Sequence, residues 1–367
     1  MDRVRRIAYH GFVSRSRNRR REEEAPVRSS PYIVSRAYDW FFFILPPLFA
    51  LALGIAIAGR FSTQITVDAY GKEHQPIMSY LIGIIIHAHL VAVLVRSHNN
   101  RAIFNLYPIR FTVVPVVLWF MIAVNVWIAV AATVVATFWD VWHSGAQTFG
   151  LARIYDRNSG TAPETGRRLD LWLNQFLYLG PILAGVSLIP HLACMEEFAS
   201  AGSPFLASVP VRVAGNQRYL TWAIIAAGTA FLVFYLYSYW RLWRNGYRPP
   251  FVKVFLLVST GFCSIYTWGF NTWGEAFFIM NLFHAWQYLA LVWWMEHKRI
   301  MERLRVASLW GGKAIAAVVF FGAVFAYGYG AVIVPITLKA LWAITIVVSL
   351  MHFWYDGFVW SVRKGQV

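Results

Sequence analysis

Four histidines embedded in long apolar stretches are the residues of this sequence best suited to chemistry. Each lies in a separate stretch, and the next Lys or Arg follows nine to fourteen positions later. On helices, this spacing places the four imidazoles about 13–21 Å from the basic end of each helix. Polar groups inside a bilayer are costly and usually face the interior of a helix bundle. The pattern therefore predicts four imidazoles at one shared depth: His87, His143, His284 and His352.

Polar residues accompany three of these histidines at helical spacing. Asp140 lies three residues before His143. Asp356 lies four residues after His352, so each carboxylate shares a helix face with an imidazole. Imidazole and carboxylate together suit iron, manganese or zinc, and a carboxylate can ligate the ion or orient an imidazole. We predict a metal site, with further polar side chains around it or oriented toward substrate: Gln147, Asn281, Gln287 and Glu275.

Two more histidines lie close to His87 in the sequence. His89 stands about 200° from His87 around a helix, so the two cannot face one centre. His98 lies eleven residues after His87, on the same face and three turns away. We expect His87 and His143 to be the leading ligands, with His89 and His98 as secondary candidates. The alternative is that each polar group makes its own hydrogen bonds and only fixes helix packing. The shared depth favours the common site.

The elements that carry these residues are predicted to be membrane-spanning helices. The 367-residue chain is 58% hydrophobic and only 14% charged, with a mean hydropathy of +0.50. Soluble domains contain about 25% charged residues. Apolar runs of roughly 20 residues predict an all-α polytopic membrane bundle of about ten transmembrane helices. The runs cover residues 38–59, 77–96, 109–125, 127–152, 170–191, 219–243, 250–269, 273–296, 312–329 and 334–361.

The distribution of basic residues predicts the topology. Lys and Arg, with Arg153 and Lys253 counted among them, gather in alternate loops, as the positive-inside rule requires when both termini are cytoplasmic. A single span over residues 111–152 would invert every later loop, so we expect two helices there, with a tight turn near Asn125. Residues 1–36 are polar and Arg-rich without an apolar signal region, which predicts a basic cytoplasmic tail ahead of a bundle over residues 37–367. Pro46 and Pro47 could mark a break in the first span.

Charge and cysteine content exclude two other classes of protein. The net charge of +16 comes from short basic clusters between apolar runs, a pattern of membrane loops rather than of a nucleic-acid surface. We therefore expect no nucleic-acid partner. Cys194 and Cys263 are far apart and belong to no paired motif, which argues against a disulfide framework and against a cysteine-ligated metal.

Three segments carry a resemblance to known membrane proteins. They read WHSGAQTFGLARIYD, FHAWQYLALVWW and HFWYDGFVW. They resemble stretches of uncharacterised bacterial His-rich multi-spanning membrane proteins. Histidines scattered over several spans distantly resemble those of membrane beta-carotene cleavage dioxygenases and membrane di-iron hydroxylases. The clustered HxxxH and HxxHH boxes of membrane desaturases and alkane hydroxylases do not occur in this sequence.

We expect an integral protein of a bacterial inner membrane that uses one or two non-haem iron ions. Its reaction would be that of an oxygenase, hydroxylase or desaturase in lipid metabolism. Its partners would be membrane lipids, a lipophilic substrate and an electron donor. Three alternatives stay open: an electron-transfer protein that binds haem or a pigment through axial histidines, a transporter, and an accessory subunit of a membrane complex.

Overall fold

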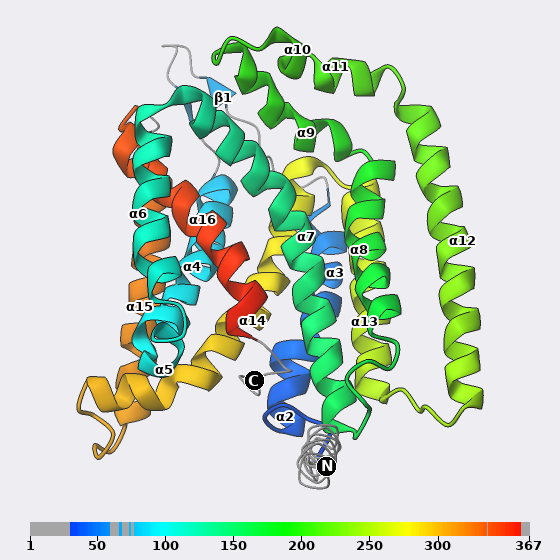
Figure 1. Ribbon diagram of the computed structural model, residues 1–367, viewed down its shortest axis with the longest axis vertical. Coiled ribbons are helices and arrows are strands. Elements are labelled where there is room, and N and C mark those ends of the chain that lie inside the picture. The colour runs from blue at the N-terminus through cyan, green and yellow to red at the C-terminus, as the bar shows by residue number, and fades with distance from the viewer. Residues whose placement is uncertain (1–29, 59–65, 68–72, 75–76, 336, 361–367) are drawn as a thin grey trace, which may run out of the picture.

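The computed structural model describes residues 30–58, 66–67, 73–74, 77–335 and 337–360, and these are almost wholly helical. Most of the predicted tail, residues 1–36, lies outside the described part. A single antiparallel pair of two-residue strands, β1 (Thr66–Val67) and β2 (Glu73–His74), precedes the second span in the described chain. The prediction of an all-α fold is confirmed for the described residues (Figure 1).

Seven helices in the described residues are long and apolar enough to cross a membrane, and two bent helix pairs raise the number to nine. Their lengths are compatible with an integral membrane protein. The seven are α4 (Ile77–Asn99), α7 (Val126–Asn158), α12 (Gln217–Arg244), α13 (Phe251–Phe270), α14 (Trp273–Arg303), α15 (Gly312–Ile333) and α16 (Lys339–Val359).

The bent pairs lie where the first and fifth spans were predicted. The first runs through α2 (Arg36–Asp39) and the π-helix η1 (Trp40–Ile44), then turns by 43° into α3 (Pro46–Ile57). Proline has no N–H to donate, so Pro46 and Pro47 begin a helix more readily than they continue one. The fifth run is α8 (Arg167–Ala184), which meets α9 (Leu188–Leu192) and the 3-10 helix η2 (Ala193–Ala199) at 99°.

The third predicted span is shorter than a straight helix that crosses a membrane. It forms α6 (Pro108–Val124), whose 17 residues are fewer than the roughly 20 that a straight span needs. The turn predicted between the third and fourth spans is present. Asn125 ends α6, and its side chain accepts a hydrogen bond from the Ile128 N–H, which begins α7. The described residues also form three short helices: α5 (Arg101–Phe104), α10 (Pro204–Ala207) and α11 (Val209–Ala214).

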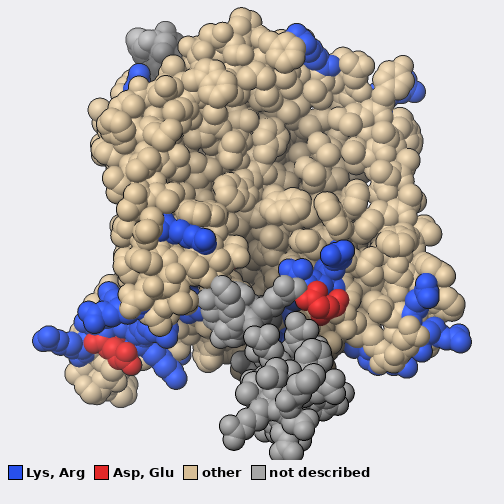
Figure 2. Space-filling view, in the orientation of Figure 1, with Lys and Arg blue, Asp and Glu red and all other residues tan. Residues whose placement is uncertain are grey.

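Basic side chains gather toward one end of the molecule. Figure 2 shows most of the Lys and Arg residues of this face at the lower end, below a broad belt with very few charges. Helix α2 and the last turn of α16 also lie toward that end (Figure 1). This distribution fits a bundle that crosses a membrane with its basic loops on one side.

Five of the described helices meet in the middle of the bundle. Helix α4 packs against α14, α15 and α16, and α16 also packs against α7. Small residues allow the closest of these approaches, as is common between helices in membranes. A Cβ added to Gly328 of α15 would lie only 2.3 Å from the backbone oxygen of Ile84 in α4. The rotation of α4 is therefore fixed in part by the helix behind it.

Replacing Gly328 by alanine should destabilise the protein by about 1–3 kcal/mol, because the added methyl group must push two backbones apart. Gly322 is a matched control on the same helix, since a Cβ there meets no atom within 4 Å. The measurement is the midpoint of thermal unfolding in detergent, followed by tryptophan fluorescence. Equal midpoints for Gly328→Ala and Gly322→Ala would contradict the close packing of α4 on α15.

Candidate metal centre

Four imidazoles converge at the centre of the bundle, one from each of α4, α7, α14 and α16. The ring centroids of His89 and His284, of His89 and His352, and of His143 and His284 are each 5.1 Å apart. Those of His143 and His352 are 4.7 Å apart. All four contacts are edge-to-face, so the rings form a closed square. None of the four residues is more than 5% exposed.

Asp356 adds a carboxylate to this square, and two neighbours orient it. Its Oδ1 accepts hydrogen bonds of 2.8 Å from the hydroxyl of Tyr288 and from the indole N–H of Trp360. Its Oδ2 faces the rings, 3.7 Å from Nε2 of His143 and 3.7 Å from Nε2 of His352. We call His89, His143, His284, His352 and Asp356 the His cluster.

The ligand-capable atoms of the His cluster form two overlapping groups. His89, His284 and His352 make one group; His143, His352 and Asp356 make the other. Within each group, one atom from every residue lies within 4.8 Å of the others. His352 belongs to both groups.

The protonation of His352 follows from its backbone contact. Its Nδ1 lies 3.1 Å from the carbonyl oxygen of Leu90, which can only accept a hydrogen bond. The hydrogen of the neutral ring is therefore on Nδ1, and Nε2 carries a lone pair. This Nε2 lies 3.1 Å from Nε2 of His143. A carbonyl bond that fixes the tautomer in this way is typical of metal-binding histidines.

Three ring nitrogens of the cluster lack a hydrogen-bond partner among the described residues. They are both nitrogens of His89 and Nε2 of His284, all buried. Each buried polar atom left in this condition costs about 1–3 kcal/mol. The alternative interpretation, in which every histidine makes its own hydrogen bonds, does not account for these atoms. Their shared position instead fits a site that holds something between the rings.

The structure brings together most of the predicted ligands and separates the rest. His143, His284, His352 and Asp356 meet, and the fourth imidazole is His89 rather than His87. His87 and Asp140 instead line a cavity of about 190 Å³, together with Asn281. His98 lies away from the cluster, with its ring nitrogens 2.8 Å from Oγ of Ser97 and 3.0 Å from the carbonyl oxygen of Phe111.

The buried stripe of α4 explains why His89 replaces His87. Ala92, Val93, Arg96 and Ser97 are all buried, and they follow His89 at helical spacing of three, four, seven and eight residues. His87 lies about 200° around the helix from His89 and is only half-buried. The polar members of this stripe, Arg96 and Ser97, were a signal in the sequence for the inward face.

Of the predicted polar neighbours, Gln147 and Gln287 lie beside the cluster and Glu275 lies away from it. Gln147 donates hydrogen bonds of 3.1 Å to the backbone oxygen of His284 and to the side chain of Gln287. Gln287 in turn donates to the backbone oxygen of Phe43. The two amides thus fix α7 and α14 beside the cluster. Glu275 lies nine residues before His284, at the start of α14, where it accepts a hydrogen bond from Thr272.

Sequence reasoning missed the two side chains that hold Asp356. Tyr288 follows His284 by four residues, and Trp360 follows Asp356 by four, so both carried the helical spacing that revealed the carboxylate. Tyr288 is 1% exposed, and its ring also packs against His352.

A cavity of about 510 Å³ adjoins the His cluster. His143 and Asp356 line one part of it, and aromatic side chains form much of the wall near them. The cavity continues along α7 as far as Arg157. We call it the α7 cavity.

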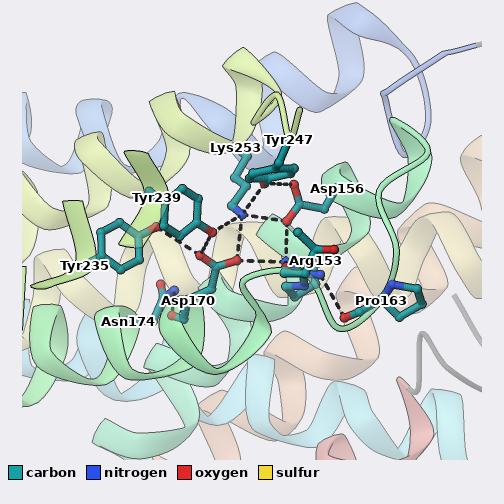
Figure 3. Close-up of polar contacts among 10 residues, drawn as sticks. Arg153, Asp156, Pro163, Asp170, Asn174, Tyr235, Tyr239, Tyr247 and Lys253 are labelled. Carbon is teal, nitrogen blue, oxygen red and sulfur yellow. Dashed lines mark hydrogen bonds and ion pairs between the residues drawn. The ribbon is translucent and has the colours of Figure 1, made fainter. Parts of the chain in front are cut away.

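A second buried polar group, absent from the sequence-based predictions, lies further along α7 (Figure 3). Asp156 and Asp170 each contact both Arg153 and Lys253. None of these four side chains is more than 7% exposed. Arg153 and Lys253 were counted as loop charges, but they lie in α7 and α13. The two positive and two negative charges balance. We call these four residues the charge clasp.

Three tyrosines complete the charge clasp. Tyr235 and Tyr239 of α12 donate hydrogen bonds to Oδ1 of Asp170, and Tyr247 donates to Oδ1 of Asp156 at 2.7 Å. Burial and the nearby Asp156 carboxylate raise the pKa of Tyr247 above its ordinary value, so this hydroxyl keeps its proton and remains a donor. The clasp therefore joins α7, α8, α12 and α13 at the basic end of the bundle.

No protein-family model, curated protein or solved structure matches this chain. Conclusions about its chemistry therefore depend on the geometry of the described residues.

Replacing Lys253 by methionine should destabilise the protein by about 3–5 kcal/mol, because it leaves two carboxylates and one arginine in a buried site with unbalanced charge. Lys313→Met is the control, since Lys313 is exposed at the start of α15. Thermal unfolding midpoints in detergent measure the difference. A Lys253→Met protein as stable as the Lys313→Met protein would show that the charge clasp contributes little to stability.

Proposed function

We propose that this chain is an integral-membrane, metal-dependent oxidoreductase of a bacterial inner membrane. It would act as a non-haem iron oxygenase, hydroxylase or desaturase on a lipophilic substrate. One observation carries the proposal: four imidazoles and an oriented carboxylate from four helices face a common point in the apolar interior. Such a concentration of ionisable groups in a membrane marks a functional site.

The distances within the His cluster support an ion as the occupant. Two nitrogens that bind one ion at about 2.1 Å, with an angle of roughly 90–110° between them, lie about 3.0–3.4 Å apart. The observed Nε2 separation of His143 and His352 is 3.1 Å, which suits a hydrogen bond between the two rings and also fits this range. The His352 lone pair and the Oδ2 of Asp356 face the same space. Asp356 would thus serve as a carboxylate ligand held in place by Tyr288 and Trp360.

The ligand chemistry favours iron among the candidate metals. Several imidazoles with one carboxylate are typical of non-haem iron sites, although manganese and zinc accept the same donors. When bound, iron supplies the activation of dioxygen. The residues of this chain provide the dry, apolar surroundings, the orientation of the ligands and a cavity beside the ion.

The packing of the rings favours an ion over haem. Two axial histidines lie on opposite sides of a haem, with their ligating nitrogens about 4 Å apart and the macrocycle filling the space around them. Here the nitrogens of His143 and His352 are closer than that, and His89 and His284 occupy the adjoining space at ring-centroid distances of 5.1 Å. A macrocycle between these rings would displace two of them.

The α7 cavity supports a lipophilic substrate. Near His143 and Asp356 its wall consists largely of Trp139, Trp142 and Phe353. Trp142 is 43% exposed on the outside of the bundle, so the cavity lies close to the lipid-facing surface. A substrate dissolved in the bilayer could reach the His cluster from this side without crossing water.

The substitutions His143→Ala and His352→Ala should each remove most of the bound metal while the helical fold is retained. Metal analysis and an absorption spectrum of detergent-purified protein provide the measurement, with circular dichroism as the check of folding. His98→Ala is the control, because His98 contacts Ser97 and Phe111 rather than the cluster. We expect stoichiometric iron without a Soret band in the unchanged protein, and dioxygen consumption that depends on a lipophilic reductant or substrate.

Two outcomes would reject this proposal. A Soret band lost with His143 would indicate haem. Absence of any tightly bound transition metal from protein purified without chelators would remove the ion from the account.

Tyr288→Phe should weaken metal binding by about 10–100-fold, the usual effect of losing a group that orients a ligand. It deletes only the hydroxyl that holds Oδ1 of Asp356. Competition with a chelator of known affinity measures the change. Tyr327→Phe is a suitable control, because it deletes a buried hydroxyl in α15 that makes no hydrogen bond among the described residues and lies outside the His cluster. Equal affinities for the two variants would show that Asp356 needs no such support.

A further inference from the structure

The polarity of the α7 cavity is divided along its length. His143 and Asp356 lie in one part, and Arg157 and Arg167 lie in another. On α7, fourteen residues separate His143 from Arg157, a rise of about 21 Å. The wall between them is largely apolar and includes Ala146, Phe149, Gly150, Ile154 and Leu291. The shape and polarity match a molecule with an apolar chain and a charged end.

The cationic end of the α7 cavity carries an excess of positive charge. Residues 157–168 contain three arginines and one glutamate. Arg157 and Arg167 are half-buried, and Arg167 lies over the ring of Phe149 at 5.9 Å. A guanidinium presents five donors in a rigid fork that matches the oxygens of a phosphate or a carboxylate. The opposite charge in the cavity, Asp356, lies at the His cluster.

Arg157 donates a hydrogen bond of 3.4 Å to Oδ1 of the adjacent Asn158. Arg153 also lines the α7 cavity, where its donors hold the neighbouring loop. It contacts Asp156 and Asp170, and donates to the backbone oxygens of Pro163 and Thr165 at 3.0 and 2.9 Å (Figure 3). These bonds hold the loop between α7 and α8 against α7. Because Arg157 and Arg167 lie at the two ends of this loop, the charge clasp fixes the distance between their backbones.

We propose that the α7 cavity binds an amphiphile whose anionic oxygen head group, a phosphate or a carboxylate, lies between Arg157 and Arg167, with its apolar chain along α7 toward His143. This proposal rests on the proposed function, because it identifies the substrate class of the same site. It also gives the charge clasp a second role: the clasp positions the head-group arginines as well as joining four helices.

Gly150 offers a steric test of where the chain lies. It lines the apolar part of the α7 cavity, and a Cβ built on it meets no atom within 4 Å. A leucine at this position therefore extends into the cavity without disturbing the packing of α7. It should obstruct the chain of the amphiphile and leave the arginines in place.

The experiment measures binding of radiolabelled hexadecyl phosphate, hexadecanoate and hexadecanol to the purified full chain in an uncharged detergent. We expect the two anions to bind at least about tenfold more tightly than the alcohol, as charge-assisted hydrogen bonds to a guanidinium would produce. Arg157→Gln combined with Arg167→Gln should remove this preference. Gly150→Leu should weaken all three ligands. Arg168→Gln, which changes an exposed arginine beside the site, should change none of them.

Three results would overturn the proposal. One is equal binding of hexadecanol and the two anions by the unchanged protein. Another is an Arg168→Gln effect as large as that of the double variant, which would indicate general attraction to a basic surface. The third is inorganic phosphate competing as strongly as hexadecyl phosphate, which would assign the arginines to a free anion.

Metal content is measured on every variant in the same preparations. We expect it to be unchanged in all of them, because none of the substituted residues belongs to the His cluster. Absence of the head-group preference from the unchanged protein, with metal bound, would leave the proposed function intact and reject only the substrate class. Absence of metal from the unchanged protein, with the preference present, would reject the proposed function and leave the binding of an anionic amphiphile intact.

Discussion

The structure depends on one constraint: polar groups that enter a bilayer must find partners inside the protein. Four helices each place an imidazole in the apolar interior. Water is excluded from the hydrocarbon region of a bilayer, so the rings contact one another. Asp356 places Oδ2 beside the same point, while its Oδ1 accepts hydrogen bonds from Tyr288 and Trp360. The rotation and depth of α4, α7, α14 and α16 are thereby linked. A helix that turned by one residue would leave its imidazole in contact with hydrocarbon.

Helix α7 connects the two polar centres of the protein. It contributes His143 to the His cluster and, about three turns later, Arg153 and Asp156 to the charge clasp. Buried ion groups of this kind seldom add much net stability over apolar packing, but removal of one partner is costly because the others lose their compensation. In this fold the clasp fixes the end of α7 relative to α8, α12 and α13. The α7 cavity between the two centres is therefore built on a segment of α7 that is held at His143 and again at Arg153 and Asp156.

Much of the bundle could be predicted because it depends on local composition and depth. The shared depth of His143, His284 and His352 could be predicted from their distances to the next basic residue. Asp356 could be predicted from its spacing of four residues after His352. Depth could not decide between His87 and His89, since both lie at a suitable depth. It depends on which face of α4 turns inward, and contacts with α15 at Gly328 help to decide this. The count of ten spans is not confirmed, because two of the predicted spans are bent helix pairs and α6 has only 17 residues. Arg153 and Lys253 were interpreted as loop charges because sequence alone does not show that two aspartates lie beside them.

X-ray absorption spectroscopy at the metal edge of the purified protein tests the central claim most directly. The account predicts nitrogen and oxygen neighbours at about 2.0–2.2 Å, with the outer-shell scattering of at least three imidazoles, and the loss of one imidazole contribution in His89→Ala. A spectrum with sulfur neighbours, with the scattering of a porphyrin, or with no imidazole contribution would contradict it.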